Sequence, residues 1–185
     1  MTENKRFKTG NVITVSIAHF INDVYTSFLS PVAPLLIDKL GINYALIGIL
    51  QIFQRIPMLL NPVIGILSDK KKRVSYLVII TPAITTIFMS FIGVANSFVV
   101  LCLIFFVSGI SSAVFHVTSP VVIKQVAGNK IGKGMSFYMI GGEFARTLGP
   151  LIILGAISIW GFEGSYKLVP FGILVSVFLY FQFIG

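Results

Sequence analysis

Charged and amide side chains interrupt four long apolar stretches of this sequence, where a polar group is costly. A charged residue at the centre of a membrane costs roughly 2.5 to 3.5 kcal/mol on insertion scales, so its presence there usually serves a function. At a helical period of about 3.6 residues, the polar residues of each stretch fall on a common face. We therefore predict a substrate or proton pathway formed by His19, Asn22, Asp23, Gln54, Arg55, His116, Glu143 and Arg146.

The charged members of this set also have a structural explanation, which the sequence leaves open. Asp23 can pair with Arg55 between neighbouring spans, because both lie near mid-span and neither has another obvious partner in those spans. Glu143 can pair with Arg146 three positions later on the same helix. In that interpretation the charges only neutralise one another.

Metal and cofactor chemistry are not expected. His19 and His116 lack the spacing of metal ligands along the sequence. The single cysteine, Cys102, excludes an internal disulfide and any site built from several cysteines. No nucleotide-binding loop is present, so ATP is not the expected energy source.

The elements that position these residues are predicted to be transmembrane helices. Of the 185 residues, 56% are hydrophobic and only 11% are charged, which is far from a soluble domain. A helix needs about 20 apolar residues to cross a bilayer. We predict an all-α membrane protein with one domain over residues 1–185 and six spans, at 12–37, 43–68, 74–93, 97–123, 133–158 and 167–185. Spans 74–93 and 167–185 carry no central charge and are expected to face mostly lipid.

The basic residues indicate the orientation of the chain. Cytoplasmic loops of membrane proteins carry an excess of lysine and arginine. Both termini are therefore expected in the cytoplasm, in a multi-pass protein of the cell membrane. Because the basic residues lie between apolar spans and not on one polar face, nucleic acid is not an expected partner. Ten of the 14 basic residues fall on the cytoplasmic side of this topology: Lys5, Arg6, Lys8, Lys70, Lys71, Lys72, Arg73, Lys124, Lys130 and Lys133.

A weak internal repeat fits an inverted three-helix architecture. The tripeptide at 30–32, Ser-Pro-Val, lies near the end of the first span and recurs at 119–121 near the end of the fourth. Three spans per repeat reverse the orientation of the second copy, as in the halves of many secondary transporters.

Small residues on the fifth span predict close helix packing. Gly141, Ala145 and Gly149 recur every fourth position, which lets a neighbouring backbone approach. Gly142 and Pro150 belong to the same predicted packing region.

The segment from Gly65 to Arg73 resembles the loop between helices two and three of the major facilitator superfamily. The family pattern has Gly, then Asp, then basic residues, and here these are Gly65, Asp69, Lys70 and Arg73. Lys72 stands where the pattern has glycine. An aspartate at a helix end beside four cations can pair with a neighbouring helix, so the resemblance implies a conformational latch.

Within that superfamily, the chain resembles the first half of the fosmidomycin-resistance transporters, which normally have twelve helices. It departs from relatives at Val117, where proline is usual, and at Glu143, where asparagine is usual. The resemblance implies a secondary transporter working by alternating access, with proton-coupled efflux of a small and anionic molecule. Asp23 or Glu143 would carry the proton. The matching segments are 18–23, 61–65 with 68–70, 111–116, and 141–144 with 148–150.

One half of such a transporter supplies only one wall of a central site. The expected partners are therefore the lipid bilayer, a small-molecule substrate, protons, and either a missing second six-helix half or a homodimer mate. A non-transporting or truncated membrane protein that acts as a scaffold or partner half is the main alternative. A remote alternative is a rhomboid-like intramembrane protease with Ser111 as nucleophile, although span 167–185 lacks the histidine that this arrangement requires.

Overall fold

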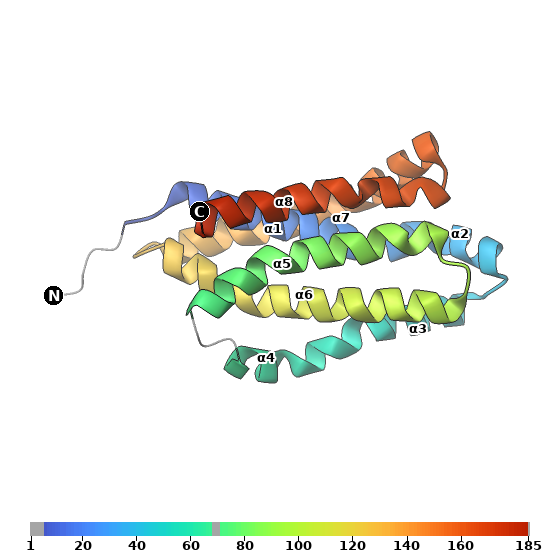
Figure 1. Ribbon diagram of the computed structural model, residues 1–185, viewed down its shortest axis with the longest axis horizontal. Helices are drawn as coiled ribbons and strands as arrows, with labels where there is room; N and C mark the ends of the chain where they lie inside the picture. Colours follow the sequence, from blue (N-terminus) through green and yellow to red (C-terminus); the bar gives the residue numbers. More distant parts are fainter. Residues whose placement is uncertain (1–5, 68–70, 185) are drawn as a thin grey trace.

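The computed structural model describes residues 6–67 and 71–184, and over those residues it contains helices and no strands. Figure 1 shows the long helices lying side by side along the long axis of the molecule. In chain order the elements are α1 (Thr9–Thr26), α2 (Leu29–Leu40), α3 (Tyr44–Arg55), η1 (Ile56–Leu60), α4 (Asn61–Leu67), α5 (Lys71–Ser90), η2 (Phe91–Val94), α6 (Phe98–Val126), α7 (Ile131–Trp160), η3 (Glu163–Leu168) and α8 (Val169–Phe183).

The predicted fold class, an all-α membrane protein with six spans, is confirmed. The described chain holds six helical segments long and apolar enough to cross a membrane. In lipid, the helical hydrogen bonds of each segment satisfy its backbone polar groups internally, and its apolar side chains suit the hydrocarbon. The spans are Thr9–Leu40, Tyr44–Leu67, Val74–Val94, Phe98–Val126, Ile131–Trp160 and Glu163–Phe183.

Proline interrupts the first two spans. Pro31 has no amide hydrogen for the carbonyl of Ser27, and its ring crowds that carbonyl. The helix accordingly breaks at Ser27 and Phe28, between α1 and α2. In the second span Pro57 stands at the start of the 3-10 helix η1, directly after α3. Both breaks leave backbone groups outside the regular helical pattern.

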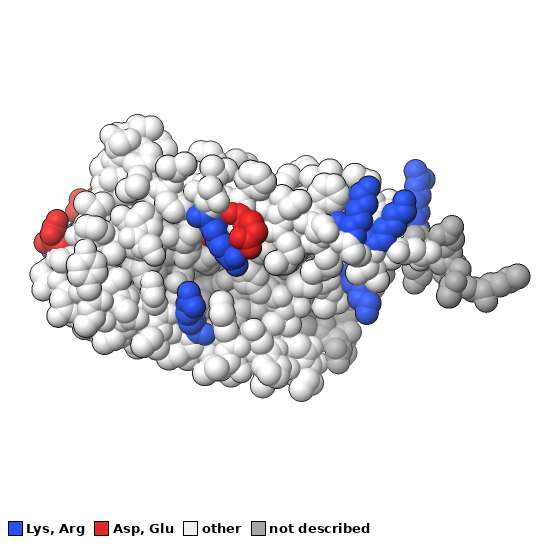
Figure 2. All heavy atoms as spheres, turned by 180° about the vertical axis from the view of Figure 1, so that it is seen from behind, with Lys and Arg blue, Asp and Glu red and all other residues white. Residues whose placement is uncertain are grey.

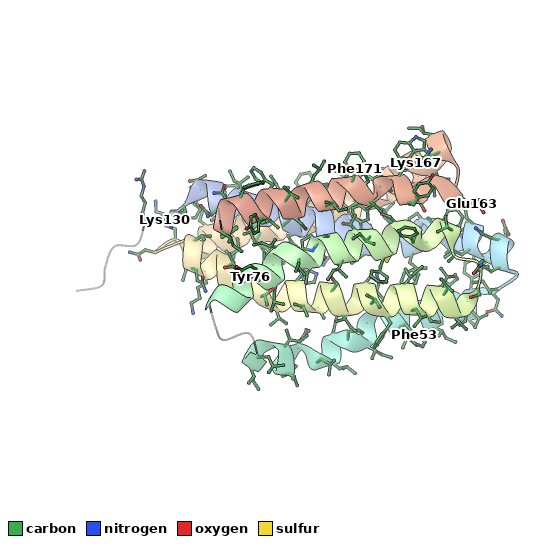
Figure 3. All side chains as sticks on the ribbon, viewed as in Figure 1. Phe53, Tyr76, Lys130, Glu163, Lys167 and Phe171 are labelled. Atoms are coloured by element: carbon green, nitrogen blue, oxygen red, sulfur yellow. The ribbon has the colours of Figure 1, made fainter. Side chains whose placement is uncertain are left out.

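The third span does not face mostly lipid, so that prediction is wrong. Its helix α5 packs against α1, α6 and α8. Thr85 and Thr86 on this helix are fully buried, and Thr85 Oγ1 donates to Ser111 Oγ at 2.9 Å. The prediction counted only charged residues, whereas threonine hydroxyls also form a buried polar face. The sixth span is largely exposed, and Phe171 on α8 points away from the bundle (Figure 3).

Glycines bring α1 and α7 into close contact. A Cβ atom at Gly141 would lie 2.5 Å from the carbonyl oxygen of Ser16, and one at Gly149 would collide with the Ser27 hydroxyl. Real Cβ atoms cannot approach a backbone oxygen so closely, so only glycine allows this helix spacing. The glycines predicted to mediate helix packing thus pack against one side of α1.

Charged residues are unevenly distributed between the two ends of the molecule. Figure 2 shows lysine and arginine gathered at one end of the molecule, with acidic residues at the other end. The backbone amide of Lys8 donates to the carbonyl of Val126 at 2.9 Å, which places Lys8 beside the end of α6. Lys130 lies at this basic end, whereas Glu163 and Lys167 lie at the opposite end (Figure 3).

One lysine joins three elements at the opposite end. Lys39, near the end of α2, donates through Nζ to the carbonyl of Gly93 in η2 at 2.7 Å. The same ammonium donates to Oε1 of Glu163 in η3 at 2.9 Å. The ends of the first, third and sixth spans are therefore tied together at this end of the molecule.

Candidate functional site

The four spans predicted to face a polar space all contribute to one cavity. It has a volume of about 550 Å³ and is lined from α1, α2, α3, η1, α6 and α7. The face of the molecule seen in Figure 2 carries charged side chains at mid-length as well as at the ends. Among the predicted pathway residues, those that line the cavity are Asp23, Gln54, Arg55, His116 and Arg146.

Asp23 lies between two histidines at the wall of this cavity. Its Oδ2 is 3.2 Å from Nε2 of His19, one helical turn earlier on α1. Its Oδ1 is 3.0 Å from Nε2 of His116 on α6. Asp23 and His19 are buried, with exposed fractions of 5% and 4%, whereas the His116 side chain is 31% exposed. The three side chains form a cluster that joins α1 to α6, which we call the histidine–aspartate cluster.

The predicted ion pair between Asp23 and Arg55 is not formed, so this expectation is wrong. The acidic group has the two histidines as its partners, and Arg55 makes no ion pair among the described residues. The physical reason is spacing: His19 and Asp23 stand one turn apart on the same helical face, so the nearest partner of the carboxylate is on its own helix. Arg55 instead extends into the cavity as an exposed side chain.

The environment of His19 fixes which ring nitrogen carries hydrogen. Nδ1 is 2.8 Å from the backbone carbonyl of Tyr138, and a carbonyl can only accept, so Nδ1 must donate. In a neutral imidazole Nε2 is then a bare acceptor, and it faces the carboxylate of Asp23, which is also an acceptor when ionised. This contact is favourable only when a positive charge, either a proton or a cation, is shared between them.

Further polar and aromatic groups hold the cluster in place. Asn22, which is fully buried, donates through Nδ2 to Asp23 Oδ1 at 3.0 Å and to Ser112 Oγ at 3.3 Å. The Tyr138 ring stacks on the His19 ring, with centroids 3.9 Å apart and an interplanar angle of 10°. The Tyr138 hydroxyl bonds Ser119 at 2.7 Å. These contacts restrict the orientations of His19 and Asp23.

Tyr138 is the member of this site that sequence reasoning missed. It lies three and four positions before Gly141 and Gly142, on the small-residue face of α7 that packs against α1. That spacing was the available signal, because i, i+3 and i+4 positions share one face of a helix.

Glu143 and Arg146 form the ion pair expected at i, i+3. Arg146 donates through one terminal nitrogen to Glu143 Oε1 at 2.7 Å. Both side chains are more than half exposed, at 62% and 65%. Such a pair contributes little to stability, since solvent screens it. Arg146 lines the cavity, and Pro150 lies one turn further along the same wall.

Gln54 couples the second span to the break in the first. Its Nε2 donates to the carbonyl of Thr26 at 3.1 Å, at the end of α1. Gln54 also lies close to Gly109 on α6, where a Cβ atom would meet the Gln54 backbone. The predicted pathway residue thus serves as a contact between three spans.

The predicted conformational latch falls mostly outside the described residues. Asp69 and Lys70 are not among them, and neither is the side chain of Arg73. Gly65 lies in α4, where, among the described residues, a Cβ atom would meet only Val117, at 4.0 Å. The latch stays a prediction.

Ser111, the nucleophile of the protease alternative, is engaged in helix packing. Its hydroxyl donates to the carbonyl of Thr81 at 2.7 Å and accepts from Thr85. His116 lies on the same helix and contacts Asp23. No histidine bonds Ser111 in the part of the chain that the structure describes, so the activation that a serine nucleophile needs has no support here.

Six spanning helices, four of which line a polar cavity, describe a multi-pass membrane protein, and comparison with known proteins gives its family. The family model described as Major Facilitator Superfamily matches residues 15–184, so the chain belongs to that superfamily. Its six helices make up one half of the superfamily fold.

The chain resembles the N-terminal half of the fosmidomycin-resistance family. It is 29% identical over 161 residues to the fosmidomycin resistance protein of Escherichia coli (strain K12), which covers 86% of this chain and 39% of that protein. It is also 29% identical over 145 residues to an uncharacterized MFS-type transporter, YfnC, of Bacillus subtilis (strain 168), covering 76% of this chain and 34% of the relative. The chain thus spans about two fifths or less of these relatives. No solved structure gives a significant match.

Proposed function

We propose that this chain forms one half of a proton-coupled secondary transporter, which exports a small anion by alternating access. Membership of the superfamily supports transport, because its members move solutes through a site between two six-helix halves. The resemblance to a fosmidomycin resistance protein supports efflux. In this proposal the substrate cavity is the one lined by Asp23, Arg55 and Arg146.

The observation that carries the anionic substrate class is the free guanidinium of Arg55. It lines the cavity and forms no ion pair with any described residue. Arginine presents several donors in a planar fork that matches carboxylates and phosphates. Gln54 and Arg146 also line this cavity and can add donors to a bound anion. An unpaired arginine in a membrane-depth cavity favours binding of an anion over a cation.

Asp23 and Glu143 are the two candidate proton carriers in this proposal. Asp23 is the better placed, because it is buried at the cavity wall, whereas Glu143 is exposed and paired with Arg146. Proton relays in transporters are built from such intramembrane carboxylates and histidines.

The proposed orientation places the basic end of the molecule, with both termini, in the cytoplasm. Lys8, Lys124, Lys130 and Lys133 all stand at helix ends or in connections near this end, and all are exposed. This distribution agrees with the excess of cytoplasmic lysine and arginine in membrane proteins. The latch residues between the second and third spans would then also face the cytoplasm.

A second wall for the cavity comes, in this proposal, from another six-helix half or from a second copy of the chain. Alternating access in this architecture is the rocking of one bundle against another around a central site. A homodimer related by an axis along the membrane normal would place two copies of Arg55 across one space. The scaffold alternative predicts instead that the cavity binds no solute.

Anion binding can be tested on the chain itself by thermal unfolding in detergent. Fosmidomycin, a phosphonate, is the first probe because of the relative's name, and inorganic phosphate is the second. A bound ligand raises the unfolding midpoint with concentration. Arg55→Gln should weaken the apparent affinity at least tenfold, since a hydrogen bond to a charged group contributes about 1.5 to 3 kcal/mol.

Lys130→Gln is the matched control, because Lys130 is exposed at the basic end, away from the cavity lining. It should leave binding unchanged. Equal weakening by both substitutions would show general charge attraction and contradict an anion site at Arg55. Absence of any ligand-dependent shift with either probe would favour the scaffold alternative.

Transport is tested in proteoliposomes with an imposed pH gradient. The chain joined to a second six-helix half should show saturable flux driven by the gradient, and the chain alone should show none. Robust transport by a demonstrable monomer would overturn the half-transporter interpretation.

A further inference from the structure

We propose that His19, Asp23 and His116 form a three-ligand binding site for a divalent transition-metal ion of the zinc class. Two imidazoles and one carboxylate, each offering one donor atom, have those atoms within 4.8 Å of one another. The proposal concerns the histidine–aspartate cluster and does not depend on the direction or substrate of transport.

The distances in the cluster match those between ligands of a small metal ion. Zinc binds histidine nitrogen and carboxylate oxygen at about 2.0 to 2.2 Å, so neighbouring ligand atoms of a tetrahedral site lie roughly 3.4 Å apart. His19 Nε2 and His116 Nε2 stand 3.2 Å and 3.0 Å from the Asp23 carboxylate oxygens. All three ligand atoms lie within 4.8 Å of one another, so the two imidazole nitrogens need to approach each other by at most about 1.4 Å to seat an ion.

The hydrogen-bonding of His19 already selects the metal-binding form of its ring. Because Nδ1 donates to the Tyr138 carbonyl at 2.8 Å, Nε2 is the nitrogen left with a lone pair. Metal-ligating histidines usually have this second contact, from the far ring nitrogen to a backbone carbonyl or a carboxylate. A cation between Nε2 and Asp23 also removes the unfavourable meeting of two acceptors.

The surroundings of the cluster orient its carboxylate as well. Asn22 Nδ2 donates to Asp23 Oδ1 at 3.0 Å, and Asn22 is itself fully buried. Tyr138 stacks on the His19 ring. Ligands held in this way lose little freedom when an ion binds, which favours affinity.

The donor set decides the class of ion. Imidazole nitrogen suits zinc, copper, iron and nickel, whereas magnesium and calcium prefer oxygen ligands only. Three protein ligands leave a fourth position for water or another oxygen donor. Asp23 and His116 line the cavity, so this position faces the space in which the proposed substrate anion would lie.

Cobalt(II) is the probe for the test, because its visible absorption reports the number and type of ligands. The full chain is expressed without a polyhistidine tag, purified in detergent, freed of metal with a chelator and titrated with cobalt chloride. We expect one ion per chain, a spectrum typical of four or five ligands, and displacement by zinc. Magnesium at the same concentration should not displace cobalt.

Substitutions then assign the ligands. His116→Gln and Asp23→Asn should each weaken cobalt binding more than tenfold, while Glu163→Gln, an exposed carboxylate at the far end of the bundle, should leave it unchanged. His116→Cys keeps a ligand atom, so it should retain binding and add a thiolate-to-cobalt charge-transfer band. That band appears only if residue 116 touches the ion.

Three results would overturn the proposal: no saturable binding by the wild-type chain, binding that His116→Gln leaves intact, or equal displacement by magnesium. If a substitution prevents folding, the wild-type cobalt spectrum and the magnesium competition still decide. The measurement involves no transport, so failure of the proposed transport function and failure of the metal site are recorded separately.

Discussion

Replacement of Gly142 by alanine should destabilise the protein by displacing the His19 ring. A Cβ atom at this position would lie 2.6 Å from Cε1 and 3.0 Å from Nε2 of His19. Carbon atoms in contact normally lie about 3.5 to 4.0 Å apart, so the ring must move by roughly 1 Å. Such a movement disturbs the 3.2 Å contact between Nε2 and Asp23 and the hydrogen bond from Nδ1 to Tyr138.

The expected loss combines three effects. Overpacking a well-filled site costs about 1 to 3 kcal/mol, and weakening a hydrogen bond to a charged group costs about 1.5 to 3 kcal/mol. Alanine recovers about 1 kcal/mol relative to glycine within a helix. The net decrease in the free energy of unfolding is therefore about 1.5 to 5 kcal/mol, which corresponds to a midpoint lower by roughly 3 to 20 °C for a chain of this size.

Thermal unfolding of the purified protein in detergent, followed by circular dichroism, measures this change. Gly155→Ala is the matched control, because it is the same substitution on the same helix with nothing within 4 Å of the new Cβ atom. Gly155→Ala should leave the midpoint unchanged or raise it slightly. Equal midpoints for the two variants would refute the close contact between α7 and His19.

Two further predictions concern the partners of Asp23 and the orientation in the membrane. In double-mutant cycles on thermal stability, the effects of Asp23→Asn and His116→Gln should be non-additive by about 0.5 to 3 kcal/mol. The effects of Asp23→Asn and Arg55→Gln should be additive. Coupling only in the second pair would show that Asp23 pairs with Arg55 and not with His116. The orientation is measured in intact cells after the natural cysteine has been replaced. A single cysteine introduced at Glu163 should react with an impermeant thiol reagent added outside, and one introduced at Lys130 should not. The reverse labelling pattern would contradict the proposed orientation.

The spans and the polar cavity could be predicted because both follow from simple periodicities. Long apolar runs mark the six helices, and the 3.6-residue period places Asp23, Arg55, His116 and Arg146 on faces that line one space. Neither inference requires knowledge of how the helices pack. The superfamily match confirms the fold class that these patterns predict.

The partners of Asp23 could not be predicted in the same way, because they depend on helix rotation and depth. His116 is distant in sequence, and only packing of α1 against α6 brings its ring to the carboxylate. The i, i+4 spacing of His19 and Asp23 was visible in the sequence, but opposite formal charge favoured Arg55 as the partner. Tyr138 acts through its backbone carbonyl, a group that every residue carries and no motif records.

The break between α1 and α2 makes the first span two rigid helices joined by a hinge at Ser27 and Phe28. Pro31 has no amide hydrogen to donate to the Ser27 carbonyl, so this helical hydrogen bond is missing in any arrangement of α1 and α2. Helix α1 is held against α7 by glycine contacts, while α2 is tied through Lys39 to η2 and η3. Tilting α2 against α1 at this hinge would break the hydrogen bond from Gln54 to the Thr26 carbonyl, which contributes about 0.5 to 1.5 kcal/mol. The binding of a single ion or solute beside the break can supply enough free energy to offset the loss of this one bond.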